Sequence, residues 1–406
     1  MHGDRLCEKC GQLVPRGVEE CPICANSLGF KLRRETIVLL ICLLVALLFV
    51  VTAITVKQFH AQERELGERW YRSGAAMLAH GNPVAALTDF RAALAHAGGN
   101  PLYELRLAQA LVDSGHEVEA RTYLERLWSA NPADGPVNLE LALWAERTGN
   151  VPEVISYYHN AIDGSWPSGS HAGRRDLRRD LCEYLLDHGQ RTAALEELTA
   201  LRSETPDNPG QMTEVASLFL RSGDYNSAQK EFLRSLRLNR HQPAAWAGAG
   251  KAAFLTGDYR AARRYLSDAV AGNPHDQDSA EMLKEADDVL RIDPFDRRVP
   301  ATVRRRRAIL AFDTAVARLA SCAQSRGENV TAPAPASQSG LPQLYSQAMN
   351  TKPEMTERSL RNDPDLLDSG MQLVFQIERQ TNRACGPPLG LDQALLLIAQ
   401  RNGGAD

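Results

Sequence analysis

The sequence predicts a nearly all-α chain built largely from stacked helix pairs, and three observations support this. Alanine, leucine, arginine and glutamate are abundant, and all four favour helices. The 21 residues 36–56 contain no charged side chain. A fixed period is typical of repeat proteins, in which each unit covers the apolar face of the next. Six glycines recur every 34 residues, with one spacing of 40: Gly81, Gly115, Gly149, Gly189, Gly223 and Gly257.

The overall composition is that of an ordinary folded protein with two or three domains. The chain has 406 residues, of which 44% are hydrophobic and 24% charged, and its formal net charge is -4. This balance does not favour binding to nucleic acid. The first 28 residues carry only Arg5, Lys9 and Arg16 as basic residues, so a nucleic-acid regulator acting through this end is also disfavoured.

Four cysteines near the N-terminus form two CxxC pairs, Cys7 with Cys10 and Cys21 with Cys24, separated by ten residues. Two such turns facing each other give the closed four-thiolate shell of a structural Zn²⁺ site, which has no open position for catalysis. Residues 5–28 resemble the short zinc ribbons at the ends of many bacterial proteins, and we expect a zinc ribbon over residues 1–30. Two disulfides in a secreted module remain the alternative.

The uncharged stretch 36–56 predicts one transmembrane helix, because 21 residues at about 1.5 Å each match a hydrocarbon core of about 30 Å. The stretch is too long for a removable signal peptide, and no A-x-A-type site follows it. A reduced compartment suits thiolate ligands, and clustered basic residues favour the cytoplasmic side. We therefore expect a cytoplasmic N-terminus and extracytoplasmic repeats. Three basic residues cluster before the stretch and three are spread after it: Lys31, Arg33 and Arg34 against Lys57, Arg64 and Arg69.

The 34-residue period resembles that of the tetratricopeptide repeat family, a helix-turn-helix unit. Trp70, Gly74, Ala86 and Phe90 lie where the family pattern has Trp, Gly, Ala and Phe. The resemblance implies six units over residues 67–275. The longer spacing comes from an insert at about 164–173, which could divide the array into two halves of three units.

In this family the first helix of each unit lines a concave groove. The resemblance implies that the groove is apolar in the first half and polar in the second, which suits a helix or extended peptide with one apolar end. It lacks the Lys and Asn pattern of the family's carboxylate clamps. We expect a protein or peptide partner, and neither nucleic acid nor a small-molecule substrate. The implied groove residues are Tyr71, Leu105, Gln109, Leu139, Leu143, Arg179, Glu183 and Lys251.

Beyond the repeats we expect capping and C-terminal helices over 276–325, a linker over 326–343 and a helical tail over 344–406 with helices at 364–381 and 391–401. If this side is extracytoplasmic, Cys322 and Cys385 could form a disulfide worth about 4 kcal/mol. The run Arg304 to Arg307 could bind phosphate or acidic lipid. A solvated helix end is the favoured interpretation, because consecutive helical residues point in different directions.

The sequence contains none of the common catalytic motifs, and its ten histidines do not cluster with acidic residues at ligand spacing. We therefore expect no enzyme activity. The favoured hypothesis is a single-pass, membrane-anchored scaffold that binds a protein partner through its groove. The alternative is a cytoplasm-facing adaptor of envelope or lipopolysaccharide assembly. It resembles a family that joins tetratricopeptide repeats to a metal knuckle, but that family places the knuckle after the repeats.

Overall fold

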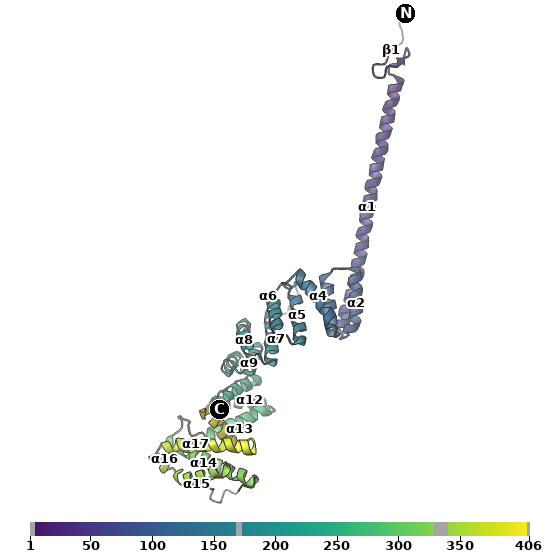
Figure 1. Cartoon of the computed structure of the whole chain (residues 1–406). Coiled ribbons are helices and arrows are strands. Elements are labelled where there is room, and N and C mark those ends of the chain that lie inside the picture. Colours follow the sequence, from purple (N-terminus) through teal and green to yellow (C-terminus); the bar gives the residue numbers. More distant parts are fainter. Residues whose placement is uncertain (1–4, 168–172, 329–339, 404–406) are drawn as a thin grey trace. The chain divides into compact units, whose positions relative to one another are not determined.

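The computed structural model describes residues 5–167, 173–328 and 340–403, and most of them are helical (Figure 1). This confirms the all-α prediction. The chain divides into two compact units, residues 1–167 and residues 168–406. Both units contain paired helices with small side chains where the helices cross.

The first unit begins with a two-stranded hairpin, β1 (Arg5–Leu6) and β2 (Leu13–Val14), followed by the long helix α1 (Pro22–Ala79). Helix α1 contains the uncharged stretch and continues into the first repeat. No glycine or proline lies between residues 57 and 66, so nothing in the sequence ends the helix there. Ion pairs one turn apart, Glu65 with Arg69 and Glu68 with Arg72, support its exposed part.

Three helix pairs complete the first unit, the end of α1 serving as the first helix of the first pair. Asparagine or aspartate side chains cap several of these helices, and Asn82 accepts a hydrogen bond from the Ala85 amide at 3.2 Å. Prolines in the first turn supply the fixed φ that a helix start favours. The helices are α2 (Pro83–His96), α3 (Pro101–Asp113), α4 (Glu117–Ala130), α5 (Gly135–Thr148) and α6 (Val151–Asp163).

The second unit opens with three more helix pairs. In both units the recurring glycine follows the first helix of its pair, and the six glycines have φ between 71° and 88°. This backbone conformation is strained for any residue with a side chain, which explains why glycine marks the period. The helices are α7 (Arg174–Asp187), α8 (Arg191–Glu204), α9 (Pro209–Ser222), α10 (Tyr225–Leu238), α11 (Pro243–Leu255) and α12 (Tyr259–Gly272).

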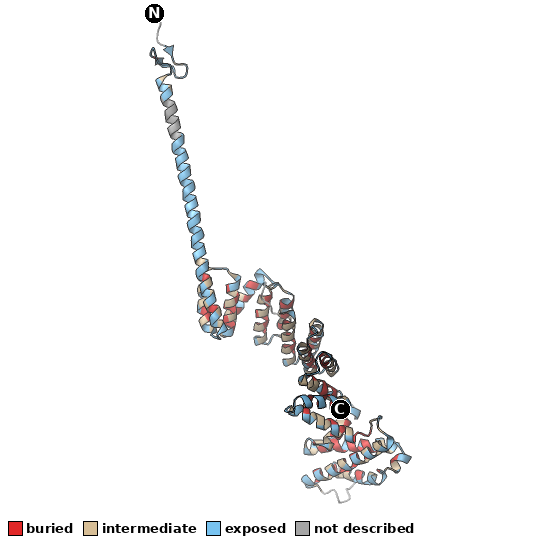
Figure 2. Cartoon of the chain, turned by 180° about the vertical axis from the view of Figure 1, so that it is seen from behind, coloured by how far each residue is buried: buried red, intermediate tan, exposed pale blue. Residues whose placement is uncertain are grey.

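Small residues at the helix crossings allow the paired helices to approach closely. A Cβ added at Gly74 would lie 2.9 Å from the Phe90 ring, and one added at Gly250 would lie 2.6 Å from Leu266. Buried residues follow the facing sides of the paired helices in both units (Figure 2). The crossings are thus packed too tightly for an added side-chain carbon.

The start of the insert folds back onto the first unit. The Gly135 amide donates to the Ser165 carbonyl at 2.9 Å, and the Trp166 indole donates to the Ala161 carbonyl at 2.9 Å. Trp166 lies over Gly135, where a Cβ would come within 2.3 Å of the indole nitrogen. The rest of the predicted insert, residues 168–172, lies outside the described residues.

The C-terminal helices are part of the second unit, packed on its last repeats. Helix α18 contacts α13, α14 and α17, and one core of buried side chains extends from Cys182 to Ala399. The tail expected after a linker is therefore integral to this unit, and α15 begins inside the expected linker. The helices are α13 (Gln277–Ile292), α14 (Ala301–Ser325), α15 (Leu341–Thr351), the short α16 (Ser359–Asn362), α17 (Asp365–Cys385) and α18 (Leu391–Gly403), with a 3₁₀ turn at Lys352–Glu354.

A buried carboxyl group lies within this C-terminal packing. Glu378 on α17 is fully buried, with Oε2 3.5 Å from the Arg318 Nε, and Asp392 lies nearby on α18. Burial, with repulsion from the Asp392 carboxylate, raises the pKa of Glu378 to about 8, although Arg318 opposes the shift. Glu378 therefore keeps its proton at neutral pH in the folded chain.

The raised pKa predicts that the stability of the second unit falls as pH rises from 4.5 to about 8, because unfolding releases the Glu378 proton across that window. Glu378 contributes at most about 1.4 kcal/mol per pH unit to the change of the free energy of unfolding with pH. Replacing Glu378 with Gln should remove this part of the slope and raise the urea midpoint at pH 8.5 more than at pH 4.5. Urea unfolding followed by circular dichroism at several pH values tests this.

The exposed Glu354 provides the control, because Glu354→Gln should shift the midpoint equally at both pH values. An unchanged pH slope in the Glu378→Gln variant would contradict the prediction.

Candidate functional site

The N-terminal hairpin holds the four predicted metal-ligating cysteines together. Cys7 directly follows β1, and its amide and carbonyl bond to the Gln12 carbonyl and the Gly11 amide, both at 2.8 Å. Gly11 has a φ of 73°, which suits the tight turn between the strands. Cys21 precedes the first residue of α1, and Cys24 lies in the first turn of that helix. A hairpin turn and a helix start thus face each other.

The four sulfur atoms lie within 4.8 Å of one another, so they could hold a metal ion. Cys7 Sγ is 3.9 Å from Cys24 Sγ, and Cys10 Sγ is 3.6 Å from Cys21 Sγ. Four ligands at about 2.3 Å from a tetrahedral Zn²⁺ would be about 3.8 Å apart. These separations fit a four-thiolate shell, and they are too long for the alternative of two disulfides, whose sulfur atoms would be about 2.05 Å apart.

Neighbouring groups push the pKa values of the cysteines apart. Backbone amides of Lys9 and Cys10 donate to the Cys7 sulfur and lower its pKa to about 6. The other sulfur atoms, Cys10 foremost, raise the pKa of Cys24 to about 12. Four thiolates this close repel each other, which is the situation that a bound cation relieves.

Helix α1 is long and apolar enough to cross a membrane, with a mean hydropathy of 3.4 over its most apolar window. No part of the described chain covers that window (Figure 2). Its large side chains, such as Leu44 and Phe49, are 65% and 69% exposed. An exposed apolar surface of this size would be unfavourable in water, because removal of apolar area from water is what stabilises folded chains.

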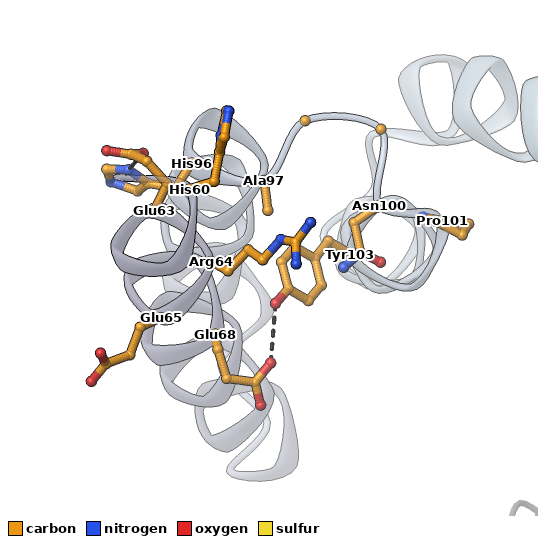
Figure 3. Close-up of a pocket in the computed structure, with 12 residues that line it drawn as sticks. His60, Glu63, Arg64, Glu65, Glu68, His96, Ala97, Asn100, Pro101 and Tyr103 are labelled. Atoms are coloured by element: carbon orange, nitrogen blue, oxygen red, sulfur yellow. Dashed lines mark hydrogen bonds and ion pairs between the residues drawn. The ribbon is translucent and has the colours of Figure 1, made fainter. Parts of the chain in front are cut away.

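A polar pocket that no local sequence pattern predicts lies where α1 enters the repeats. His96 Nδ1 on α2 is 2.8 Å from Glu63 Oε2 on α1, with His60 beside them (Figure 3). Tyr103 donates to Glu68 at 3.0 Å (Figure 3). The pair does not contradict the expectation that the histidines lack ligand spacing along the sequence, because His96 and Glu63 lie 33 residues apart. His96 is far from Glu63 in sequence, so only folding reveals the pair.

The predicted groove residues of the first unit have different environments. Tyr71 stacks on Tyr103 with ring centroids 4.8 Å apart, and Leu105 is buried in the core. Gln109 donates to Glu140 Oε1 at 2.5 Å. Burial raises the pKa of Glu140. Leu105 is therefore a packing residue that a partner could not reach. The half-exposed Leu139 and Leu143 on α5 remain accessible.

In the second unit, ion pairs engage the predicted groove residue Arg179. Its guanidinium contacts Asp180 at 2.7 Å and Glu214 at 3.4 Å, and the neighbouring Arg175 also pairs with Glu214. This network links α7 to α9. Glu183 is partly buried and Lys251 is exposed, so these two side chains remain accessible.

The remaining candidates from the sequence lie on α14 and α17 in the C-terminal region. Cys322 and Cys385 form a disulfide in the structure, with Cα atoms 6.0 Å apart, which joins α14 to the end of α17. The run Arg304 to Arg307 lies in the first turns of α14, and only Arg306 is exposed. The interpretation of this run as a solvated helix end therefore holds for Arg306 alone.

Comparison with known proteins identifies repeats in both units. Residues 77–142 and residues 215–277 match sequence models described as tetratricopeptide repeat. Cellulose synthase 1 operon protein C of Komagataeibacter xylinus is 29% identical over 96 residues, which is 24% of this chain but only 7% of that protein.

The chain is also similar to solved structures. The C-terminal part of a TPR repeat-containing protein from Cytophaga hutchinsonii is 17% identical, over 58% of this chain and 93% of that one, with a TM-score of 0.44. PilF of Pseudomonas aeruginosa is 15% identical, over 55% of this chain and 99% of that one, with a TM-score of 0.39. The matches, with the helix pairs formed at the same positions, identify residues 77–142 and 215–277 as tetratricopeptide repeats.

Proposed function

We propose that the chain is a single-pass, membrane-anchored tetratricopeptide scaffold that holds a protein partner and has no catalytic role. The observation that carries this proposal is the uncovered apolar stretch of α1, which continues without a break into the first helix of the array. Tetratricopeptide proteins bind peptide or protein partners. The similarity to the cellulose synthase operon protein covers 7% of that protein, so it does not indicate a substrate.

The accessible groove residues differ in chemistry between the two units. Leu139 and Leu143 on α5 offer an apolar contact in the first unit. Glu183 and Lys251 offer polar contacts in the second unit. A helix or extended peptide with an apolar face would match the first set, and one with charged side chains would match the second.

Replacing both Leu139 and Leu143 with Glu should weaken capture of the partner by at least about tenfold, because buried apolar contacts dominate most interfaces. Quantitative crosslinking and pull-down from the native membrane, compared with the unmodified chain, measures the loss. Val118→Glu is the control, since Val118 is 86% exposed on α4, a second helix of its pair. Equal capture by the Leu variant and the unmodified chain would argue against this groove.

We further propose that the four cysteines bind one structural Zn²⁺ ion. The sulfur separations support tetrahedral thiolate ligation, and all four ligands come from protein, leaving no open position for chemistry. The hairpin is too small to bury a core of its own, so the metal would hold it folded.

Elemental analysis of the purified full chain should find about one zinc ion per chain. The double substitution Cys10→Ser and Cys21→Ser should abolish it, whereas Cys42→Ser, in the apolar stretch, should retain it. Removing the metal with a chelator should increase hydrogen exchange in residues 5–24 while the repeats stay protected. Metal-free protein with a protected hairpin would overturn the proposal.

For topology, we propose that the N-terminus is cytoplasmic and the array extracytoplasmic. The proximity of Cys322 and Cys385 supports this placement, because disulfides persist in oxidising compartments. The clustered thiolates at the opposite end of the span suit a reducing compartment. The basic cluster that precedes the span also favours the cytoplasm for the N-terminus.

A reporter that is active only outside the cytoplasm, fused after Asp406, should be active. Cys322 and Cys385 should resist alkylation in intact membranes until a reductant is added, whereas the N-terminal cysteines should not be linked to them. An inactive fusion with freely alkylated Cys322 and Cys385 would instead favour the cytoplasm-facing adaptor.

A further inference from the structure

An arginine-lined pocket lies within the second unit, away from the groove residues. It has a volume of about 590 Å³ and lies where the turn between α13 and α14 meets α16, the start of α17 and the end of α18. Five arginines and a single carboxylate, that of Asp368, contribute to its lining. The arginines are Arg297, Arg304, Arg305, Arg361 and Arg401.

Most of these arginines lack a direct ion-pair partner, and the Glu357 carboxylate attracts Arg305 and Arg361 only at longer range. Arg401 pairs with Asp293 at 2.7 Å. Within the described residues, the other four arginines form no side-chain ion pair or hydrogen bond. Elsewhere arginines are usually paired, as Arg178 is with Glu197 and Glu204. Because like charges at short range repel, a cluster of four unpaired guanidinium groups is unfavourable unless an anion joins it.

Two buried hydrogen-bond donors also indicate that an anion would be favourable here. The Nε atoms of Arg304 and Arg305 are shielded from solvent and have no hydrogen-bond partner in the described part of the chain. Buried polar groups in folded proteins are nearly always hydrogen-bonded, so each such donor needs an explanation. Both atoms belong to residues that line the pocket, which places donors without acceptors beside a cavity.

The side chains that line the pocket indicate which class of ligand it would bind. Guanidinium groups bind phosphate and carboxylate groups with paired hydrogen bonds, and a phosphate monoester carries more charge than a carboxylate. The volume lies within the range of small-molecule sites. Phe295, Leu360 and Leu367 add an apolar wall that could contact the rest of the ligand.

We propose that this pocket binds a phosphate-bearing molecule through Arg304, Arg305 and the arginines around them. The same chemistry would recognise a soluble phosphate ester or the phosphate headgroup of a lipid. The site is separate from the partner groove, so the repeats could hold a protein while the C-terminal helices bind this ligand.

Isothermal titration of the full chain in an uncharged detergent, with sodium pyrophosphate and separately with dihexanoylphosphatidic acid, tests the proposal. Saturable binding that weakens with added salt is expected. The double substitution Arg304→Gln and Arg305→Gln should weaken it by at least about tenfold. Binding of pyrophosphate would indicate a soluble ligand, and binding of the lipid alone would indicate a headgroup.

The neighbouring Arg306 supplies a matched control. It is exposed, pairs with Glu357 and does not line the pocket, so Arg306→Gln should leave the affinity nearly unchanged. Arg304→Lys with Arg305→Lys keeps the charge but loses the planar guanidinium, and should lose affinity to an intermediate degree. Circular dichroism confirms that each variant is folded. No binding of either probe, or equal losses in the Arg306 control, would overturn the proposal.

Discussion

The whole structure depends on one constraint: each helix pair has an apolar face that only its neighbour can cover. Close approach makes this possible, and it requires glycine or alanine at the crossings, as at Gly74 beneath Phe90 and Gly250 beneath Leu266. The recurring glycines with positive φ then turn the chain back at the correct point. Together these residues account for the 34-residue period of the sequence.

An array of this kind must also end, and the C-terminal helices provide the ending of the second unit. Helix α13 follows the last repeat, and α18 packs against it with Leu395 and Ile398 fully buried. Since α17 and α18 return from far along the chain, the disulfide between α14 and α17 lies where it would limit their separation. The region is thus both a cap for the repeats and the site of the arginine pocket.

The features that could be predicted from the sequence are those that depend on residues close together in the chain. The glycine period, the two CxxC pairs and the uncharged stretch each occupy a short window, and the structure forms helix pairs, a four-cysteine cluster and an apolar helix there. The arginine pocket could not be predicted, because Arg361 and Arg401 reach Arg304 only through tertiary packing. The burial of Leu105 and the ion pairs of Arg179 depend equally on neighbouring helices.

In the proposed membrane-anchored arrangement, the uninterrupted helix α1 would fix both the distance of the first repeat from the bilayer and the direction that this repeat faces. Each residue between Val56 and Gly67 advances the helix by about 1.5 Å and turns it by about 100°. Adding or deleting one residue would therefore change the direction that the first repeat faces far more than its height. With a flexible linker, the height of the first repeat and the direction that it faces would vary independently, whereas here the length of the helix sets both.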